Sequence, residues 1–229
     1  YYFEHGGDPR GSDVIYDREG ASVTTATPSE LPVGAIEGAD LFYTSGITPA
    51  LSSTLADTTA ALLTAARGAG VTTAFDLNYR SKLWSPEAAR AAYTSLFPHV
   101  DTLVAAERDV RTCLDREGDA VEVANGLLNE YDFRTVVLTR GEHGSVAVRD
   151  GEVFEQDAYP ADTIDPVGSG DAFVGGYLAH RVYGGDVADA LAHGAAAASL
   201  TRTVDGDVAV VTADEVEAVV DNDGGGLSR

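Results

Sequence analysis

The sequence has a single cysteine, no methionine and only one tryptophan in 229 residues. With Cys113 alone, no disulfide can form within the chain. No apolar run approaches the ~20 residues that span a bilayer. The opening stretch, YYFEHGGDPRGS, also lacks the basic segment that begins a secretory signal peptide. We therefore expect a soluble, cytoplasmic protein without a membrane partner.

Positive charge is also scarce. The chain has 15 basic residues against 37 acidic ones, a formal net charge of −22, and Lys82 is the only lysine. A field this negative repels nucleic acid, so we expect no nucleic-acid partner. The acidic excess together with lysine depletion favours adaptation to high intracellular salt, where the Debye length falls to ~3 Å at 1 M. A solvated acidic surface without special meaning is the simpler alternative.

The apolar fraction of 44% allows a sizeable core, and apolar residues recur with alternating strand and helix periods. Expected strands are 13–26 (two strands around a turn at Glu19-Gly20), 41–46 (buried), 71–78, 101–106, 135–141 and 144–151. Expected helices are 52–69, 85–97, 122–131, 172–184, 186–202 and 213–220. This alternation predicts an α/β fold with a mostly parallel sheet. The polar, glycine-rich tail 222–229 is expected to be disordered.

Polar clusters follow several of these apolar runs, at 44–46, 76–80, 139–141 and 165–171. Open α/β sheets bind ligands outside the carboxyl ends of their strands. We therefore expect these clusters to share one edge of the sheet. Asp76 and Asn78 have a second interpretation, in which they hold the strand end through turn hydrogen bonds.

The segment DPVGSGDAFVGGYL (165–178) places small residues and a carboxylate before an apolar helix. If the helix starts near Asp171, the peptide N–H groups of Gly168, Ser169 and Gly170 have no intrahelical acceptor, and the helix dipole adds positive charge there. Such a bend suits a phosphate. Asp171 beside it would accept a proton from an attacking alcohol. Alternatively, Asp171 is only an N-cap.

This segment resembles, along its whole length, the second signature of the ribokinase-like (pfkB) carbohydrate kinases. The resemblance implies a Rossmann-type three-layer core with a small β lid, and transfer of the ATP γ-phosphate to a sugar hydroxyl with Mg²⁺. K⁺ is an additional candidate ion. By resemblance, Asp171 is the general base, and Gly168, Ser169 and Gly170 form the anion hole. Ser169 replaces the alanine that is usual there.

The resemblance also implies nucleotide and metal positions. LTRGEHGS (138–145) resembles the nucleotide-contacting strand and turn, which assigns Thr139, Gly141 and Gly144, although a plain hairpin turn is the alternative. AHGAAAASLTR resembles the segment beside the adenine, which makes Ala197 and, more weakly, His193 candidates; helix packing is the alternative. The family's Asn-x-x-Glu motif is only partly kept in DTLVAAERDV, where Ala106 takes the Asn position. Asp109 and Glu107 are the acidic candidates for the metal.

Three further stretches, FDLNYRSKLW, SGITPAL and YYFEHG…VIYDREGAS, resemble 2-keto-3-deoxygluconate kinases. This similarity assigns the sugar site to five residues: Tyr2, Tyr16, Arg18, Asn78 and Arg80. The assignment is chemically reasonable, because an arginine fork recognises a carboxylate bidentately. The alternatives are pairing of Arg18 with Asp17 or Glu19, and of Arg80 with Asp76.

The expected function is ATP-dependent phosphorylation of 2-keto-3-deoxygluconate to its 6-phosphate, in an Entner–Doudoroff-type route. The alternatives are another sugar kinase of the family, such as a fructokinase or ribokinase, and an inactive fragment. The last arises because the resemblance implies further strands and a Gly-Gly motif ahead of Tyr1. We expect one kinase domain over 1–221, with lid strands at about 1–27. The partners would be a sugar acid and ATP, with a homo-oligomer formed by lid exchange.

Overall fold

The structure is a computed structural model that describes residues 1–221 apart from 5, 7–8, 12 and 19. Its main feature is a six-stranded sheet of order β3-β4-β5-β6-β7-β8. The strands are β3 (Leu41–Ser45), β4 (Thr72–Asp76), β5 (Thr102–Ala106), β6 (Thr135–Thr139), β7 (Ser145–Arg149) and β8 (Glu152–Gln156). β3 to β6 are parallel, whereas β7 and β8 pair antiparallel. The predicted α/β fold is confirmed.

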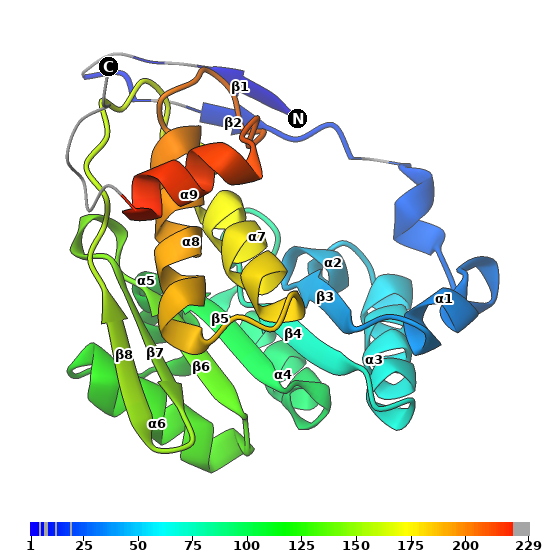
Figure 1. The fold of residues 1–229 in the computed structure, drawn as a ribbon. Coiled ribbons are helices and arrows are strands. Elements are labelled where there is room, and N and C mark those ends of the chain that lie inside the picture. The colour runs from blue at the N-terminus through cyan, green and yellow to red at the C-terminus, as the bar shows by residue number, and fades with distance from the viewer. Residues whose placement is uncertain (5, 7–8, 12, 19, 222–229) are drawn as a thin grey trace.

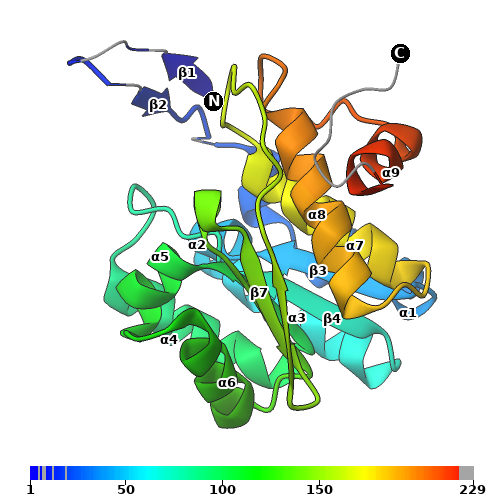
Figure 2. The same cartoon turned by 60° about the vertical axis from the view of Figure 1, so that its left-hand side comes forward.

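Helices cover both faces of this sheet, which gives three layers (Figures 1 and 2). One face packs against α3 (Ser53–Gly68), α4 (Pro86–Leu96) and α6 (Ala120–Tyr131). The other packs against α7 (Ser169–Val182) and α8 (Val187–Thr201). Successive strand residues alternate between faces, so Phe75 joins the first cluster and Ala74 the second. Both faces are buried, as a parallel sheet requires.

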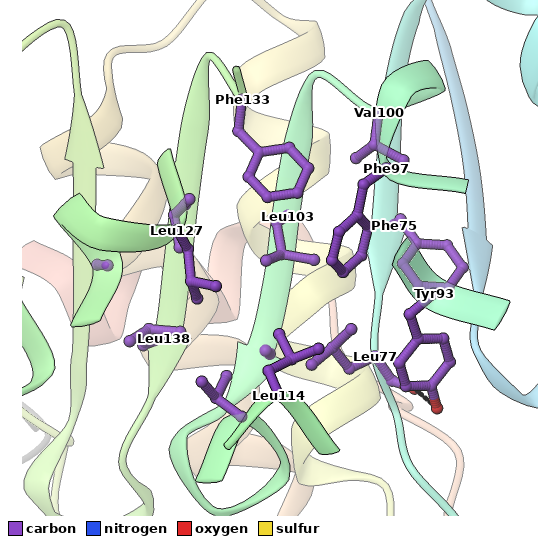
Figure 3. Packing of buried hydrophobic residues seen from close by; sticks show 14 of the residues in the cluster. Phe75, Leu77, Tyr93, Phe97, Val100, Leu103, Leu114, Leu127, Phe133 and Leu138 are labelled. Atoms are coloured by element: carbon purple, nitrogen blue, oxygen red, sulfur yellow. Dashed lines mark hydrogen bonds between the residues drawn. The ribbon is translucent and has the colours of Figure 1, made fainter. Parts of the chain in front are cut away.

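The larger core cluster is rich in aromatic rings and reaches the carboxyl end of β4 (Figure 3). Phe75 contacts Tyr93 edge to face, with ring centroids 5.6 Å apart. Tyr93 is fully buried, and its hydroxyl donates to the carbonyl oxygen of Leu77 at 2.8 Å. A buried tyrosine hydroxyl normally finds such a partner. The core thus fixes the backbone just beyond β4, where the polar cluster 76–80 begins.

Side-chain caps mark the starts of three of the predicted helices. The side chains of Ser52, Ser85 and Asp186 accept hydrogen bonds from the first turns of α3, α4 and α8. The helix expected at 213–220 is present as α9 (Ala213–Asp221). Short helices that the sequence did not reveal are α1 (Val33–Glu37), α2 (Ile47–Ala50), α5 (Glu107–Asp109) and a π-helical turn at Val110–Leu114. Within the described residues, no helix combines the length and apolarity needed to cross a membrane.

The N-terminal residues form a separate two-stranded ribbon, at the top of Figure 1. β1 (Tyr2–Glu4) pairs antiparallel with β2 (Asp13–Ile15). The prediction of two strands within 13–26 is wrong in its second half, because Ser22–Thr25 is a 3₁₀ turn. The hydroxyls of Thr24 and Thr25 bond back to carbonyl oxygens three residues earlier, which competes with strand pairing. Glu19 and the tail 222–229 lie outside the described residues.

Three other expectations need correction. β3 is half-buried rather than buried, because among the described strands it pairs only with β4. β8 was not predicted, since EVFEQ carries little apolar character. α7 begins at Ser169, three residues before the expected Ala172, so the glycine bend is already part of its first turn.

Candidate active site

The predicted convergence of polar clusters at one sheet edge is confirmed. Ser45, Asp76 and Thr139 end parallel strands and therefore lie at the same edge. The peptide N–H of Gly46 donates to the carbonyl oxygen of Asp76 at 2.8 Å. Asn78 Nδ2 donates to Asp171 Oδ1 at 3.3 Å, which joins the turn after β4 to the first turn of α7.

The bend before α7 requires glycine at position 168. Gly168 has φ = 80°, and a Cβ there would come within 2.2 Å of the carbonyl oxygen of Asp207. Ser169 is already engaged, because its hydroxyl donates to the carbonyl oxygen of Pro166 at 2.8 Å and its N–H reaches the same atom at 3.4 Å. The N–H groups of Gly170 and Asp171 have no acceptor in the part of the chain that the structure describes. The N–H of Gly168 likewise has no acceptor there, so free N–H groups lie at this helix start where the sequence predicts an anion hole, and the Asp171 N–H adds to the predicted donors.

Asp171 is exposed and lines an open cleft with a volume of about 370 Å³. α7, α8, α9 and the segment before α9 form the walls, and Gly168 and Ala197 are among the lining residues. Most of the other wall residues are small or apolar: Ala172, Gly175, Gly176, Ala179, Ala209, Val211, Ala213 and Val216. A flat apolar group can therefore approach these walls closely, and Asp171 lines the same cleft.

Two buried carboxylates lie behind Asp171. Burial raises the pKa of Asp76 from 3.8 to about 7; the Asn78 N–H opposes the rise, and the charges of Asp171 and Asp109 add to it. Burial likewise raises the pKa of Asp109, against the opposing charge of Arg108. Like charges this close to a cleft are typical of functional sites.

The N-terminal ribbon lies over this site. The Tyr1 hydroxyl donates to the carboxylate of Asp207, which lines the cleft. That bond is the main reason why the pKa of Tyr1 rises to about 12, and burial and the charges of Asp207 and Asp171 add to the rise. Tyr16 contacts Tyr1 edge-on, with ring centroids 6.2 Å apart. The predicted lid therefore reaches both the cleft wall and the neighbourhood of Asp171.

A second contact ties the ribbon to the turn after β4. Lys82 Nζ donates to Asp13 Oδ1 at 2.6 Å and to the carbonyl oxygen of Val14 at 2.7 Å. Tyr2 pairs with Ile15, and Ile15 lies two residues from Asp13, so all three are on one face of the ribbon. Tyr2 is thereby on the ribbon face that carries the Lys82 contact.

The two predicted arginines have few partners of their own. The Cζ atom of Arg18 lies 4.4 Å from the ring centroid of Tyr16, and its Nη1 is buried without a hydrogen-bond partner among the described residues. Arg80 donates to the carbonyl oxygen of Tyr79 at 3.1 Å. Within the described residues neither arginine forms an ion pair, so pairing with Asp17 or Asp76 is not seen. Both guanidinium groups remain able to bind an anion.

The predicted nucleotide residues are only partly brought together. Ala197 lines the cleft with Asp171. Thr139, Gly141 and Gly144 form the tight connection between β6 and β7, where Thr139 pairs with Ser145, and they do not line this cleft. The weaker candidate, His193, is 3.1 Å from Glu217 and stacks on His180.

The predicted metal residues are occupied by protein contacts. Glu107 forms an ion pair with Arg111. Asp109 Oδ2 accepts the N–H of Tyr79 at 3.2 Å, and Oδ1 lies 3.5 Å from Arg108 Nε. The described residues contain no group of three or more acidic, histidine or cysteine side chains placed to hold an ion. An ion held mostly by phosphate oxygens would not need one, so the metal assignment stays a prediction.

The sequence did not identify Asp207 or Tyr1 as residues of the candidate site. It also did not predict that Asp109 accepts a hydrogen bond from the Tyr79 N–H. Asp207 lies in a segment without helix or strand, 36 residues after Asp171, so no periodic pattern marks it. Its contacts with Tyr1 and Gly168 arise only when the chain folds. The second interpretation of Asp76 and Asn78, a turn hydrogen bond at the strand end, is confirmed, because the Asn78 N–H donates to Asp76 Oδ1.

Solved structures share this fold. A solved 2-dehydro-3-deoxygluconokinase from Thermotoga maritima superposes with a TM-score of 0.84 at 28% identity, covering 92% of this chain and 69% of that one. An E. coli protein described as a Ribokinase II, solved with ATP and Mg²⁺, shares the fold with a TM-score of 0.83 at 22% identity, covering 93% of this chain and 68% of that one.

Sequence comparison is more specific. The chain is 58% identical to a 2-dehydro-3-deoxygalactonokinase of Haloferax volcanii over all 229 residues, which make up 72% of that protein's length. The chain thus spans roughly two thirds to three quarters of these three relatives. The model of the pfkB family carbohydrate kinases matches residues 2–213. A match over nearly the whole chain, together with the similarity to the Haloferax protein, establishes that this chain belongs to the pfkB family of carbohydrate kinases.

Proposed function

We propose that this protein uses ATP and Mg²⁺ to phosphorylate a 2-keto-3-deoxy sugar acid. The gluconate-derived acid, giving the 6-phosphate, is the substrate that the sequence predicts. The name of the Haloferax relative makes the galactonate-derived acid an equal candidate. The observation that supports the proposal most is the exposed Asp171, which lines an open cleft and lies at a helix start with free N–H groups.

In this proposal Asp171 accepts the proton of the sugar hydroxyl as the hydroxyl oxygen attacks phosphorus. The N–H groups of Gly170 and Asp171 stabilise the charge that develops on the migrating phosphoryl group. When bound, Mg²⁺ would neutralise part of the phosphate charge. The small residues of the cleft wall, with Ala197, would leave room for the adenine. A lone carboxylate and two N–H groups can suffice, since phosphoryl transfer depends mainly on positioning and charge stabilisation.

The acid group of the substrate is assigned to arginine. The net charge of −22 repels an anionic substrate, so local positive charge is needed to bind it. Arg18 supports this role because its Nη1 is buried and has no hydrogen-bond partner among the described residues. A buried donor left unsatisfied is costly unless a ligand completes it. Arg80, Tyr16 and Tyr2 are the further candidates around it.

The test is a substrate panel assayed in molar KCl with ATP, containing both six-carbon keto acids, fructose and ribose. Arg18→Ala and Arg80→Ala should each raise the KM for the keto acid roughly 10-fold to 100-fold, as loss of a charged hydrogen bond does. Arg149→Ala is the matched control, because Arg149 pairs with Asp150 at the other end of the sheet. Unchanged KM values in both arginine variants would contradict recognition of the acid.

The alternatives give different outcomes in the same panel. Faster turnover of fructose or ribose than of either keto acid would favour a fructokinase or ribokinase. No turnover of any sugar would favour the inactive fragment, which is a reasonable outcome for a chain that spans 72% of its Haloferax relative.

We also propose that the protein functions at high salt. The relative that is 58% identical comes from Haloferax volcanii, and the charge of −22 agrees with molar salt as the working condition. Screening there removes the repulsion between carboxylates. The denaturation midpoint should fall steeply as KCl is lowered from about 2 M to about 0.1 M, where the Debye length is ~10 Å. A midpoint that does not depend on KCl would contradict this.

A further inference from the structure

The turn that follows β4 is held at every residue from 77 to 79. Leu77 N–H donates to the carbonyl oxygen of Val104 at 3.0 Å, and the Leu77 carbonyl accepts the Tyr93 hydroxyl. Asn78 N–H donates to Asp76 Oδ1 at 3.1 Å, and Tyr79 N–H to Asp109 Oδ2 at 3.2 Å. Two buried carboxylates and a buried tyrosine therefore determine where this short turn lies.

These contacts hold Asn78 in an unusual backbone conformation. Its φ of 37° is near the left-handed region, which asparagine tolerates better than most residues but which still costs energy. Residues with such a backbone conformation persist only where the surroundings hold them. The bond from its N–H to Asp76 provides that hold, and the Asn78 side chain points to α7 as a result.

At α7 the Asn78 carboxamide meets Asp171. Nδ2 donates to Oδ1 of Asp171 at 3.3 Å, and among the described residues this is the single hydrogen bond made by that carboxylate. An exposed aspartate in the first turn of a helix can otherwise adopt several rotamers. With Oδ1 held by Asn78, Oδ2 is left free to face the cleft.

We propose that Asn78 is a positioning residue that orients Asp171 for proton transfer, and that Asp76 acts through Asn78 by holding its backbone. This inference rests on the proposed kinase function, and it replaces the expectation that Asn78 serves as a sugar contact. In this proposal Asp109 also helps to hold the turn, because it accepts the N–H of Tyr79.

The energetics of Asp76 agree with such a role. Its side chain is 8% exposed and lies close enough to Asp171 and Asp109 for their charges to raise its pKa further, after burial. The charge of Arg80 opposes this rise, but less strongly than either carboxylate raises it, so Asp76 is poorly compensated for a group that served only to stabilise the strand end. Costly buried charge next to a cleft is typical of residues that serve function.

The primary test is Asn78→Ala. A positioning role predicts that kcat falls on the order of 10-fold to 100-fold, as misplacement of a reacting group by about 1 Å can do. The KM for the keto acid should stay within about twofold, because no substrate contact is lost. Asn78→Asp should lose more, since it puts a second negative charge beside Asp171. A raised KM with unchanged kcat would make Asn78 a sugar contact and overturn the inference.

Two double-variant comparisons test the chain of contacts. In an Asp171→Ala background, Asn78→Ala should not lower the residual kcat further, because the residue it orients is gone. Asp76→Ala, which removes the acceptor of the Asn78 N–H, should lower kcat in an otherwise wild-type chain but have no further effect in Asn78→Ala. Independent, multiplying losses would overturn the role of Asp76.

Asp101→Asn is the matched control, because Asp101 is equally buried, at 5% exposed, but lies at the opposite end of β4. It should leave kcat unchanged, and thermal unfolding of each variant shows whether it is folded. A wild-type chain that turns over no sugar would overturn the proposed function and this inference with it. An active chain with an altered KM alone in Asn78→Ala would overturn only the inference.

Discussion

Strand β4 has a buried aspartate near each of its ends, and the two have opposite surroundings. Asp101, beside the amino end, is 5% exposed and accepts the N–H and hydroxyl of Thr73. Arg67 Nη1 and Arg134 Nε each lie 3.3 Å from its Oδ1. Asp76, the last residue of β4, is 8% exposed, and its carboxylate accepts one hydrogen bond among the described residues, from Asn78 N–H.

The different surroundings of Asp101 and Asp76 indicate a structural role for the first and a functional role for the second. At the amino end, donors surround the carboxylate, so Asp101 links β4, α3 and the start of β6 at little electrostatic cost. At the carboxyl end, Asp76 lies near two other carboxylates, Asp109 and Asp171, and its pKa rises to about 7. Ligands bind at the carboxyl edge of such sheets, and that is the edge where the chain tolerates unfavourable charge.

The largest expected effect is at the carboxyl end. Asp171→Asn should lower kcat roughly 100-fold to 10,000-fold, which is the usual contribution of a general base. ATP binding, measured by calorimetry, should change little, since the free N–H groups remain. Asp101→Asn in the same assay should keep wild-type kcat. If Asp171→Asn retained activity, the contrast between the two ends of β4 would lose its functional meaning.

At the same end of β4, replacing Asp76 should increase the free energy of unfolding, whereas replacing Asp171 lowers kcat. Burial, mainly, raises the folded pKa of Asp76 from 3.8 to about 7. The folded chain therefore binds a proton more tightly than the unfolded chain, so the wild-type free energy of unfolding falls as pH rises through this window. Asn does not titrate. The stability of Asp76→Asn relative to wild type should thus increase by up to roughly 4 kcal/mol from about pH 4 to about pH 8.

Urea denaturation of both proteins at fixed molar KCl measures this difference. A constant offset between Asp76→Asn and wild type at all pH values would mean that Asp76 is not the strained carboxylate described above. A gain in stability combined with a loss of kcat would distinguish a functional group from a merely structural one.

At the amino end we expect the opposite stability result. Asp101→Asn should lower the free energy of unfolding by about 2 kcal/mol at neutral pH, because Arg67 and Arg134 lose their charged partner and a donor replaces an acceptor. Denaturation in molar KCl tests this. A variant as stable as wild type would show that hydration of the two arginines, which are more exposed than Asp101, compensates for the lost ion pairs.

The smallest effect concerns the N-terminal ribbon, the predicted lid. Lys82→Gln removes the charge that holds Asp13 of β2. Both side chains are more than half exposed, so the pair contributes little in high salt. We expect the KM for the keto acid to rise by about twofold in molar KCl, and somewhat more at lower salt, because exposed pairs contribute at most ~1 kcal/mol. Asp13→Asn should match it, and unequal effects would mean that the pair does not act as a unit.

The parts of the candidate site that the sequence points to are local. The glycine bend and Asp171 are neighbours in the chain, and the fold class follows from alternating periods. The motif alone did not reveal whether Asp109 and Glu107 are free to bind a metal, because that depends on their protein partners, Tyr79 and Arg111. Asp109 accepts a hydrogen bond from the N–H of Tyr79, 30 residues earlier in the chain, whereas Glu107 forms an ion pair with Arg111, four residues later.

By itself, the sequence determined the helix starts at Ser52, Ser85 and Asp186, strands β3 to β7 and the bend at Gly168, since each depends on residues a few positions apart. Only the tertiary structure decided that β2 pairs with β1, that Asp207 closes on Gly168, and that Asn78 meets Asp171, 93 residues away. These contacts join distant segments, and their energies depend on burial and charge that exist only once the sheet and helices have packed.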